Sequence, residues 1–416
     1  MNQKLFKQIK NEWRSNLWLC LELLVVSVVM WYIVDYLYVQ CRVYTEPLGF
    51  DISHCYKISI NEITDKSPEY IDDPTDEQRG EWIIDMQERL RRRPEIEYVA
   101  LGQNAHPYNN SNSGRSFRFD TLYANGFYPY REVTPDFMNV FRYEGVNGET
   151  PEQLAEMLRK GEILVSDNLL NQLDDKQPSM SQFIGTDAYE YNDSTKPCRV
   201  GASIVPVKYS DFMQGQMNRT VVMGLPEYAF WAHELVVRVR DGMDKDFIEN
   251  LRADADRHFR VGNLFISDIQ SFDDMRENFL QGEFISIRNM VTGMAFLLLN
   301  IFLGLLGTFW FRTQQRTRDI AVRKVSGATS SDVFRLLIGE GLLLLAVVTL
   351  PAVVIDANLA NLEFNQWYAG SYFSIGRILL CAAITFLIMA LMIVVGIAIP
   401  AWRAMHVTPA TALHDE

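Results

Sequence analysis

Four long apolar runs are the feature that most constrains how this chain folds. Each has roughly 20 residues or more and few ionisable groups, which is the length that an α-helix needs to cross a hydrocarbon core of ~30 Å. They are residues 17–40, 285–311, 334–354 and 377–400. The sequence therefore predicts an α-helical membrane protein with four transmembrane helices.

The first run has two interpretations, a retained anchor and a cleaved signal peptide. A signal peptide has an apolar region of ~7–15 residues followed by a small-residue cleavage site. This run is longer, and the stretch Tyr36–Cys41 contains no such site. Trp31, Tyr32, Tyr36 and Tyr38 suggest an aromatic belt at a membrane surface. The pattern favours a retained anchor.

The charges of the connecting segments predict the orientation of the spans. Lys and Arg accumulate in cytoplasmic loops. The segment 312–333 carries five basic residues, whereas 355–376 carries Asp356 and Glu363. We therefore expect residues 1–16, 312–333 and 401–416 to be cytoplasmic. The block 41–284 and the loop 355–376 are then outside, so that one large domain lies between the first and second spans.

The middle block is acidic and has the pattern of a soluble domain. Residues 43–283 contain 25 Lys and Arg against 42 Asp and Glu, a net charge of −17. Such a block repels the phosphates of nucleic acid, so no nucleic-acid partner is expected. Lys57–Asn61 alternates as a strand does, and Thr75 and Thr150 begin helices with Gln three residues later. Leu235, Val237 and Val239 suggest a half-buried strand. The prediction is a mixed α/β domain.

The motifs of common enzyme classes are missing from the sequence. There is no G-x-x-x-x-G-K-[ST] phosphate loop, no H-E-x-x-H and no G-x-S-x-G. The six histidines have no ligand spacing, so neither a catalytic nor a metal site is expected. Cys55 and Cys198 both fall in the middle block and form a disulfide only if the fold brings them together in an oxidising compartment.

A few polar and small residues lie within the apolar runs. Glu340 is inside the third run, where an ionisable group is a functional candidate. Glu22 and Asp35 lie near the ends of the first run and are expected to reach the membrane surface. Small residues allow close helix packing. They are Gly304, Gly307, Gly339 and Gly341.

The connector between the second and third runs contains the most informative motif. Residues 316–329 form a basic, helical pattern broken at Gly327, and Thr329 with Asp332 suits the start of a new helix. That helix continues into the third run. A short helix joined firmly to a span can transmit a push, and a basic patch at this position can also hold anionic lipid. The residue types leave both interpretations open.

The connector resembles the signature of the MacB/FtsX family of ABC permeases, approximately R-T-R-E-I-G-I-R-K-A-L-G-A-S. Here the stretch reads R-T-R-D-I-A-V-R-K-V-S-G-A-T, and Glu340 is similar to the family's acidic residue in the third span. The tail Pro400–Leu413 resembles the family's P-A-x-R-A-A-x-x-x-P-x-x-A-L ending. Val133–Phe137 and Phe183–Gly185 resemble parts of the MacB-like periplasmic core domain.

The resemblance implies a bacterial inner-membrane permease subunit of the mechanotransmission type, with its large domain in the periplasm. The expected partners are an ABC ATPase that binds ATP and Mg, a second permease subunit, the lipid bilayer, and a periplasmic adaptor with an outer-membrane channel. This chain itself is expected to be non-catalytic and to bind no cofactor. The implied ATPase-coupling residues are Arg316, Arg318, Asp319, Arg323, Lys324, Gly327, Ala328, Thr329 and Asp332.

Three functions are compatible with this reading. Export or efflux of peptides or drugs is the first expectation, and release of lipoproteins from the inner membrane is the second. The third, from a different class, is a membrane-anchored periplasmic sensor or scaffold without an ATPase. An ATPase that co-purifies with the chain would distinguish the first two from the third.

Overall fold

The computed structural model describes residues 13–109, 111, 113–124, 129–170, 178–190, 193–213, 218–232, 234–315, 317–362 and 374–406. The chain divides into two compact units. We call Val43–Glu283 the sheet unit, and the segments that precede and follow it in the chain the helical unit.

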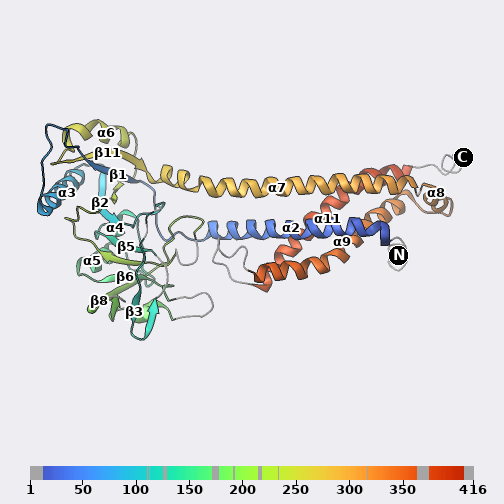
Figure 1. Cartoon of the computed structure of the whole chain (residues 1–416), viewed down its shortest axis with the longest axis horizontal. Helices are drawn as coiled ribbons and strands as arrows, with labels where there is room; N and C mark the ends of the chain where they lie inside the picture. Colours follow the sequence, from blue (N-terminus) through green and yellow to red (C-terminus); the bar gives the residue numbers. More distant parts are fainter. Residues whose placement is uncertain are drawn as a thin grey trace. The chain divides into compact units, whose positions relative to one another are not determined.

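Among the described residues, the helical unit consists of long apolar helices and one short helix. They are α2 (Trp13–Thr45), α7 (Phe272–Gln315), α8 (Thr317–Val325), α9 (Ser330–Asn361) and α11 (Ile375–His406) (Figure 1). Judged by length and composition, four helices among the described residues can cross a membrane: Leu17–Thr45, Phe272–Gln315, Ser330–Asn361 and Ile375–Ala404. The expectation of four long apolar helices is confirmed.

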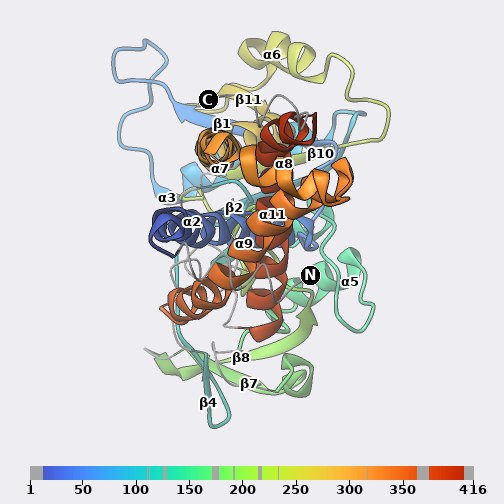
Figure 2. The same cartoon turned by 90° about the vertical axis from the view of Figure 1, so that its right-hand side faces the viewer.

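Apolar side chains both fill and surround the helical unit. Leu23 of α2, Leu305 of α7 and Leu344 of α9 belong to one buried cluster. In Figure 2, where α2 and α7 are seen nearly end on, α9 and α11 lie beside each other. Trp18 and Leu350 are exposed by 75% and 73%. An outer surface of this kind suits contact with lipid, because the helices already satisfy their own backbone hydrogen bonds.

The helices extend beyond the expected apolar runs. Helix α9 ends at Asn361, so Asp356 is part of a helix and not of the outer loop in which it was expected. Asp356 is 2% exposed. The helix continues because Val353 to Asn361 contains neither Gly nor Pro to end it. Of the expected loop 355–376, residues 355–361 belong to α9 and 375–376 to α11, and 363–373 lie outside the described residues.

One half of the sheet unit is a four-stranded antiparallel sheet with two helices. The order along the chain is β1 (Cys55–Glu62), α3 (Asp76–Arg91), β2 (Ile96–Gln103), then β10 (Glu234–Val239), α6 (Phe247–His258) and β11 (Leu264–Ser271). The strands lie in the order β11-β1-β10-β2 and all pair antiparallel. This β-α-β-β-α-β arrangement is ferredoxin-like.

The other half of the sheet unit is an insertion between β2 and β10. Its elements are β3 (Phe117–Phe119), β4 (Leu122–Ala124), β5 (Tyr130–Val133), α4 (Phe137–Val140), α5 (Pro151–Arg159), β6 (Ile163–Ser166), η1 (Met180–Phe183), β7 (Asp187–Glu190), β8 (Asp193–Ile204) and β9 (Val221–Gly224). Its strands extend the sheet in the order β5-β9-β6-β8-β7-β3-β4. The pairs β5–β9 and β6–β8 are parallel, so the sheet is mixed.

Local sequence patterns predicted several elements of this unit correctly. The capping boxes at Thr75 and Thr150 begin α3 and α5. Strand β10 differs from the prediction, because all six of its residues are buried. Val237 faces the cluster beneath α3 and α6, whereas Val236 packs with the cluster that contains α4 and α5. Helices cover both faces of the sheet at this strand, so neither face of β10 is exposed to water.

Candidate functional site

The predicted connector folds as two helices joined by a tight turn. Helix α8 ends in a Schellman motif, in which the amide of Ala328 donates to Arg323 O (3.0 Å) and that of Gly327 to Lys324 O (3.0 Å). Gly327 has φ +97°, a conformation that other residues rarely adopt. The motif satisfies carbonyls at the end of α8 and reverses the chain within a few residues.

The next helix begins at once with a reciprocal cap. The Asp332 amide donates to Thr329 Oγ1 (3.2 Å), and the Thr329 amide donates to Asp332 Oδ2 (2.9 Å). The Thr329 hydroxyl also donates to Asp332 Oδ2 (2.6 Å). This capping box satisfies two backbone amides at the start of α9. The predicted helix start is thus confirmed, and the turn is hydrogen-bonded on both sides.

Helix α8 has one buried and one exposed face. Ile320 and Ala321 are 5% and 0% exposed, and Ile320 belongs to the buried cluster of the helical unit. Val322, Arg323 and Val325 are exposed. The helix is thereby fixed to the helical unit while it presents two apolar residues and one cation.

The structure brings most of the expected coupling residues together. Arg323, Lys324, Gly327, Ala328, Thr329 and Asp332 lie in this joint between α8 and α9. Arg316 lies outside the described residues, and so do the side chains of Arg318 and Asp319. These three remain expectations.

Glu340 is buried in α9, with an exposed fraction of 2%. Its neighbour Gly341 packs closely, since a Cβ there would lie 2.5 Å from Ile397 Cδ1. A Cβ at Gly304 would lie 2.8 Å from Glu22 Oε1. These two glycines thus lie at helix contacts as predicted. At Gly307 and Gly339 a Cβ would meet open space among the described residues, so no close contact within this chain involves those two glycines.

A buried ion pair between α2 and α11 was not anticipated. Asp35 is 2% exposed, so its carboxylate is covered by protein. The Arg377 guanidinium donates from Nε to Asp35 Oδ1 (2.6 Å) and from Nη2 to Oδ2 (2.5 Å). The one signal in the sequence was opposite charges at the ends of two separate apolar runs. Such a signal does not identify which charges pair.

The aromatic residues near Asp35 also differ from the expected belt. Trp31 is 1% exposed, and its Nε1 donates to Ile378 O (3.4 Å). Tyr36 is 3% exposed. Both side chains therefore pack within the helical unit. The Trp31 indole N–H donates to a backbone carbonyl there and does not need interfacial water as a partner.

The two candidate disulfide cysteines are not joined. Cys55 is buried among the residues of β1, α4 and α5, whereas Cys198 packs against a separate cluster of the insertion. The Cys55 thiol donates to Val140 O (3.1 Å), and burial raises its pKa to about 12. Cys55 is therefore a buried packing residue and is not bonded to Cys198.

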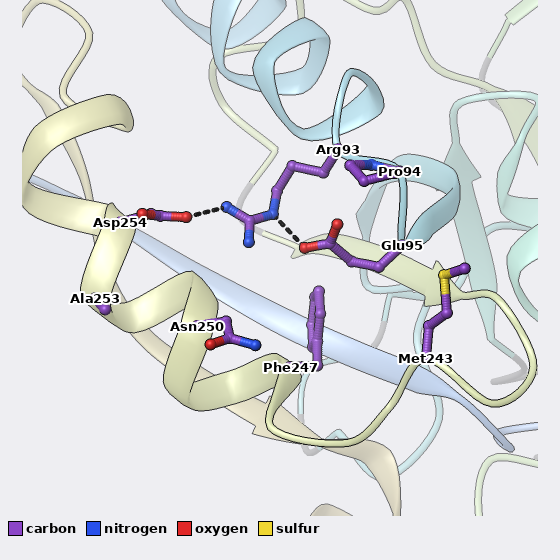
Figure 3. Close-up of a pocket in the computed structure, with 8 residues that line it drawn as sticks. All are labelled: Arg93, Pro94, Glu95, Met243, Phe247, Asn250, Ala253 and Asp254. Atoms are coloured by element: carbon purple, nitrogen blue, oxygen red, sulfur yellow. Dashed lines mark hydrogen bonds and ion pairs between the residues drawn. The ribbon is translucent and has the colours of Figure 1, made fainter.

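An open pocket of about 500 Å³ lies between the end of α3 and α6 (Figure 3). Arg93 donates from Nε to Glu95 (2.6 Å) and from Nη1 to Asp254 (2.7 Å), beside the ring of Phe247. The carboxylates of Glu95 and Asp254 compensate the positive charge of the Arg93 guanidinium, so the pocket has no obvious reactive group. Among the described residues, no cluster of His, Cys, Asp or Glu is arranged to hold a metal ion.

Comparison with known families gives one match. Residues 291–409 match the family described as FtsX-like permease C-terminal, which includes most of α7 and all of α8, α9 and α11. The match supports an ABC-type permease family, in which the permease is typically a non-catalytic transport subunit and an ATPase is the partner. With the four apolar helices, it indicates a membrane protein. The match does not include the sheet unit, and a search of curated proteins found no match to the chain.

Proposed function

We propose that this chain is the permease subunit of a bacterial ABC transporter of the mechanotransmission type. In this proposal a separate ATPase binds ATP and Mg, and the permease converts the resulting motion into rearrangement of its outer domain. The observation that carries the proposal is the joint between α8 and α9. A Schellman motif and a capping box hold α8 to α9, and α8 presents an exposed face.

The charge distribution supports a cytoplasmic location for this joint. Five basic residues lie in 312–333, and cytoplasmic loops are the ones that accumulate Lys and Arg. With the joint inside the cell, the sheet unit is outside, because a single span, α7, separates the two in the chain. We therefore place the sheet unit in the periplasm and the helices in the inner membrane.

The exposed face of α8 is the proposed ATPase contact. Val322 and Val325 are exposed by 53% and 67%, and Arg323 lies between them. Contact with a protein partner would remove these exposed apolar side chains from water, and the neighbouring cation could pair with an acidic group of the partner. Ile320 and Ala321 anchor the opposite face, so displacement of α8 would also displace α9.

The cargo and assembly are carried over from the family resemblance. We propose export or efflux of peptides or drugs by a dimer of permease subunits, with an adaptor and an outer-membrane channel completing the path. The size of the sheet unit supports an assembly with an adaptor. Its 241 residues, Val43–Glu283, are enough to form a binding surface for another protein.

The turn at Gly327 provides the test. Replacing Gly327 with Ala places a Cβ at φ +97°, which costs ~1–2 kcal/mol for an L-residue. We expect ATPase binding and coupled ATP turnover to fall roughly tenfold, since 1.4 kcal/mol is a factor of ten. Gly339→Ala is the matched control, because a Cβ there meets open space within a helix. Turnover by the ATPase that co-purifies with the chain in nanodiscs is the measurement.

A second pair of variants examines the cap. Thr329→Val removes the hydroxyl that accepts from Asp332, whereas Thr329→Ser keeps it. We expect loss of coupling in the first variant and near-normal coupling in the second. Normal turnover in both Gly327→Ala and Thr329→Val would contradict the proposal, and so would the absence of any co-purified ATPase.

A further inference from the structure

A short segment of the insertion contacts the ends of both long helices that enter the sheet unit. This segment, Pro206–Phe212, follows β8 in the chain. Helix α2 ends at Thr45 and helix α7 begins at Phe272, both within the sheet unit. The segment lies more than 150 residues after the end of α2 and 60 residues before the start of α7, so its contacts with both helices depend on the tertiary fold.

Lys208 binds the end of α2. Its Nζ donates to Val43 O (2.6 Å) and Glu46 O (3.4 Å), and lies 3.7 Å from a carboxylate oxygen of Glu46. The last carbonyls of a helix lack partners within the helix and favour a nearby cation. The Lys208 side chain is only 2% exposed. Its backbone amide also donates to Leu48 O (2.9 Å), just beyond the helix.

Asp211 binds the start of α7. The Arg276 Nε donates to both oxygens of the Asp211 carboxylate (3.1 and 3.2 Å), and Nη2 also donates to Oδ1. Asp211 is 1% exposed and accepts a further hydrogen bond from the Tyr108 hydroxyl (2.9 Å). The guanidinium and the carboxylate are thus paired in a bidentate geometry, which fixes their orientation as well as their distance.

Three other contacts connect the same parts. Arg276 Nη2 lies 3.5 Å from the Tyr44 hydroxyl, and the rings of Tyr44 and Phe212 are 5.3 Å apart. Gly49 has φ +79°, and a Cβ there would lie 2.3 Å from Pro206 O. The chain after α2 thus passes so close to Pro206 that only glycine fits.

We propose that Pro206–Phe212 is a clamp that holds the end of α2 and the start of α7 as a single body. Lys208 and Asp211 are its positioning residues. Both side chains are buried, so a charge that moved away from its partner would be left uncompensated in an apolar environment. Resting on the proposed function, the clamp would make both helices deliver motion to the insertion together. The holding itself does not require an ATPase.

The test measures the distance between the two helix ends in the full chain. Spin labels are attached at Thr45 and Glu277, both exposed, after replacement of the five native cysteines, and the chain is studied in nanodiscs without ATPase. We expect one narrow distance distribution. In Lys208→Met combined with Asp211→Asn, which removes both charges and keeps similar volumes, we expect the distribution to widen at least twofold.

Three controls separate clamping from general destabilisation. Lys66→Met with Asp65→Asn, an exposed pair in the same unit, is expected to leave the distribution narrow. A second label pair at Glu81 and Arg252, on α3 and α6, is expected to keep its distance in the clamp variant. Lys208→Arg retains the cation and is expected to retain the narrow distribution even where the double variant loses its fold.

The outcomes are distinct from those for ATPase coupling. A broad distribution in the unmodified chain or in Lys208→Arg would overturn the clamp, and so would a narrow one in the folded double variant. None of these results depends on ATP turnover. Conversely, loss of coupling in Gly327→Ala leaves the distance between Thr45 and Glu277 unchanged if the clamp holds.

Discussion

At the scale of single residues, His106 shows how burial sets the charge of a side chain. Its ring is 1% exposed, and Nδ1 donates to Pro107 O (2.7 Å). Nε2 is buried without a hydrogen-bond partner, and the ring packs edge-on against Phe272. Burial lowers the pKa of His106 below its usual value of 6.5. Folding therefore favours the neutral form of this imidazole.

This arrangement predicts a specific dependence of stability on pH. The unfolded chain takes up a proton at His106 as the pH falls through 6.5, and the folded chain does so only at a lower pH. The His106 contribution to stability therefore decreases as the pH falls below 6.5. Thermal unfolding of the full chain should show a flatter pH profile for His106→Gln.

The exposed His258 provides the matched control for this profile. We expect His258→Gln to retain the slope of the unmodified chain between pH 7.5 and 5.5. Identical slopes for His106→Gln and the unmodified chain would show that folding does not favour the neutral form of His106.

At the scale of elements, the ion pair of Asp35 and Arg377 links α2 to α11. Removal of one partner from a buried pair leaves an uncompensated charge, which costs ~3–5 kcal/mol, whereas removal of both is much less harmful. The bidentate geometry also orients the two helices. The pair therefore fixes the register of α2 against α11.

A double-mutant cycle tests this role. We expect Arg377→Met to lower the free energy of unfolding by about 3 kcal/mol, and Arg377→Met with Asp35→Leu to recover most of that loss. Unfolding of the full chain in detergent provides the measurement. Arg288→Met on α7, where the side chain is exposed, is the control. If the loss in the double variant equalled the sum of the losses in Arg377→Met and Asp35→Leu measured separately, the two charges would not interact.

At the scale of the whole molecule, the proposal requires that the α8–α9 joint and the sheet unit face opposite sides of the membrane. Ser326 lies in the joint and Lys66 in the sheet unit, and both are exposed. A cysteine at either position is therefore accessible to a maleimide from one side only.

The predicted outcome is asymmetric labelling in spheroplasts. With Cys41 replaced by Ser, a membrane-impermeant maleimide should label Lys66→Cys in intact spheroplasts and Ser326→Cys only after permeabilisation. Labelling of Ser326→Cys from outside would contradict both the orientation and the ATPase contact. Incomplete reaction is easy to recognise, because both variants should label fully after permeabilisation.

The sequence by itself determined the features that depend on neighbours along the chain. The apolar runs predicted four long helices, and Thr75, Thr150 and Thr329 predicted helix starts, because a cap needs only a side chain and an amide three residues away. The turn at Gly327 belongs to the same class. These interactions form within one turn of helix and are therefore readable as local patterns.

The tertiary structure alone decided which distant groups meet. Asp35 and Arg377 are 342 residues apart, and Lys208 reaches the end of α2 across 165 residues. It also decided that β10 is covered on both faces and that Cys55 and Cys198 lie in separate clusters. A charge or a thiol in the sequence has many chemically equivalent partners. Only the packing of the whole chain selects one, because burial makes a wrong or missing partner costly.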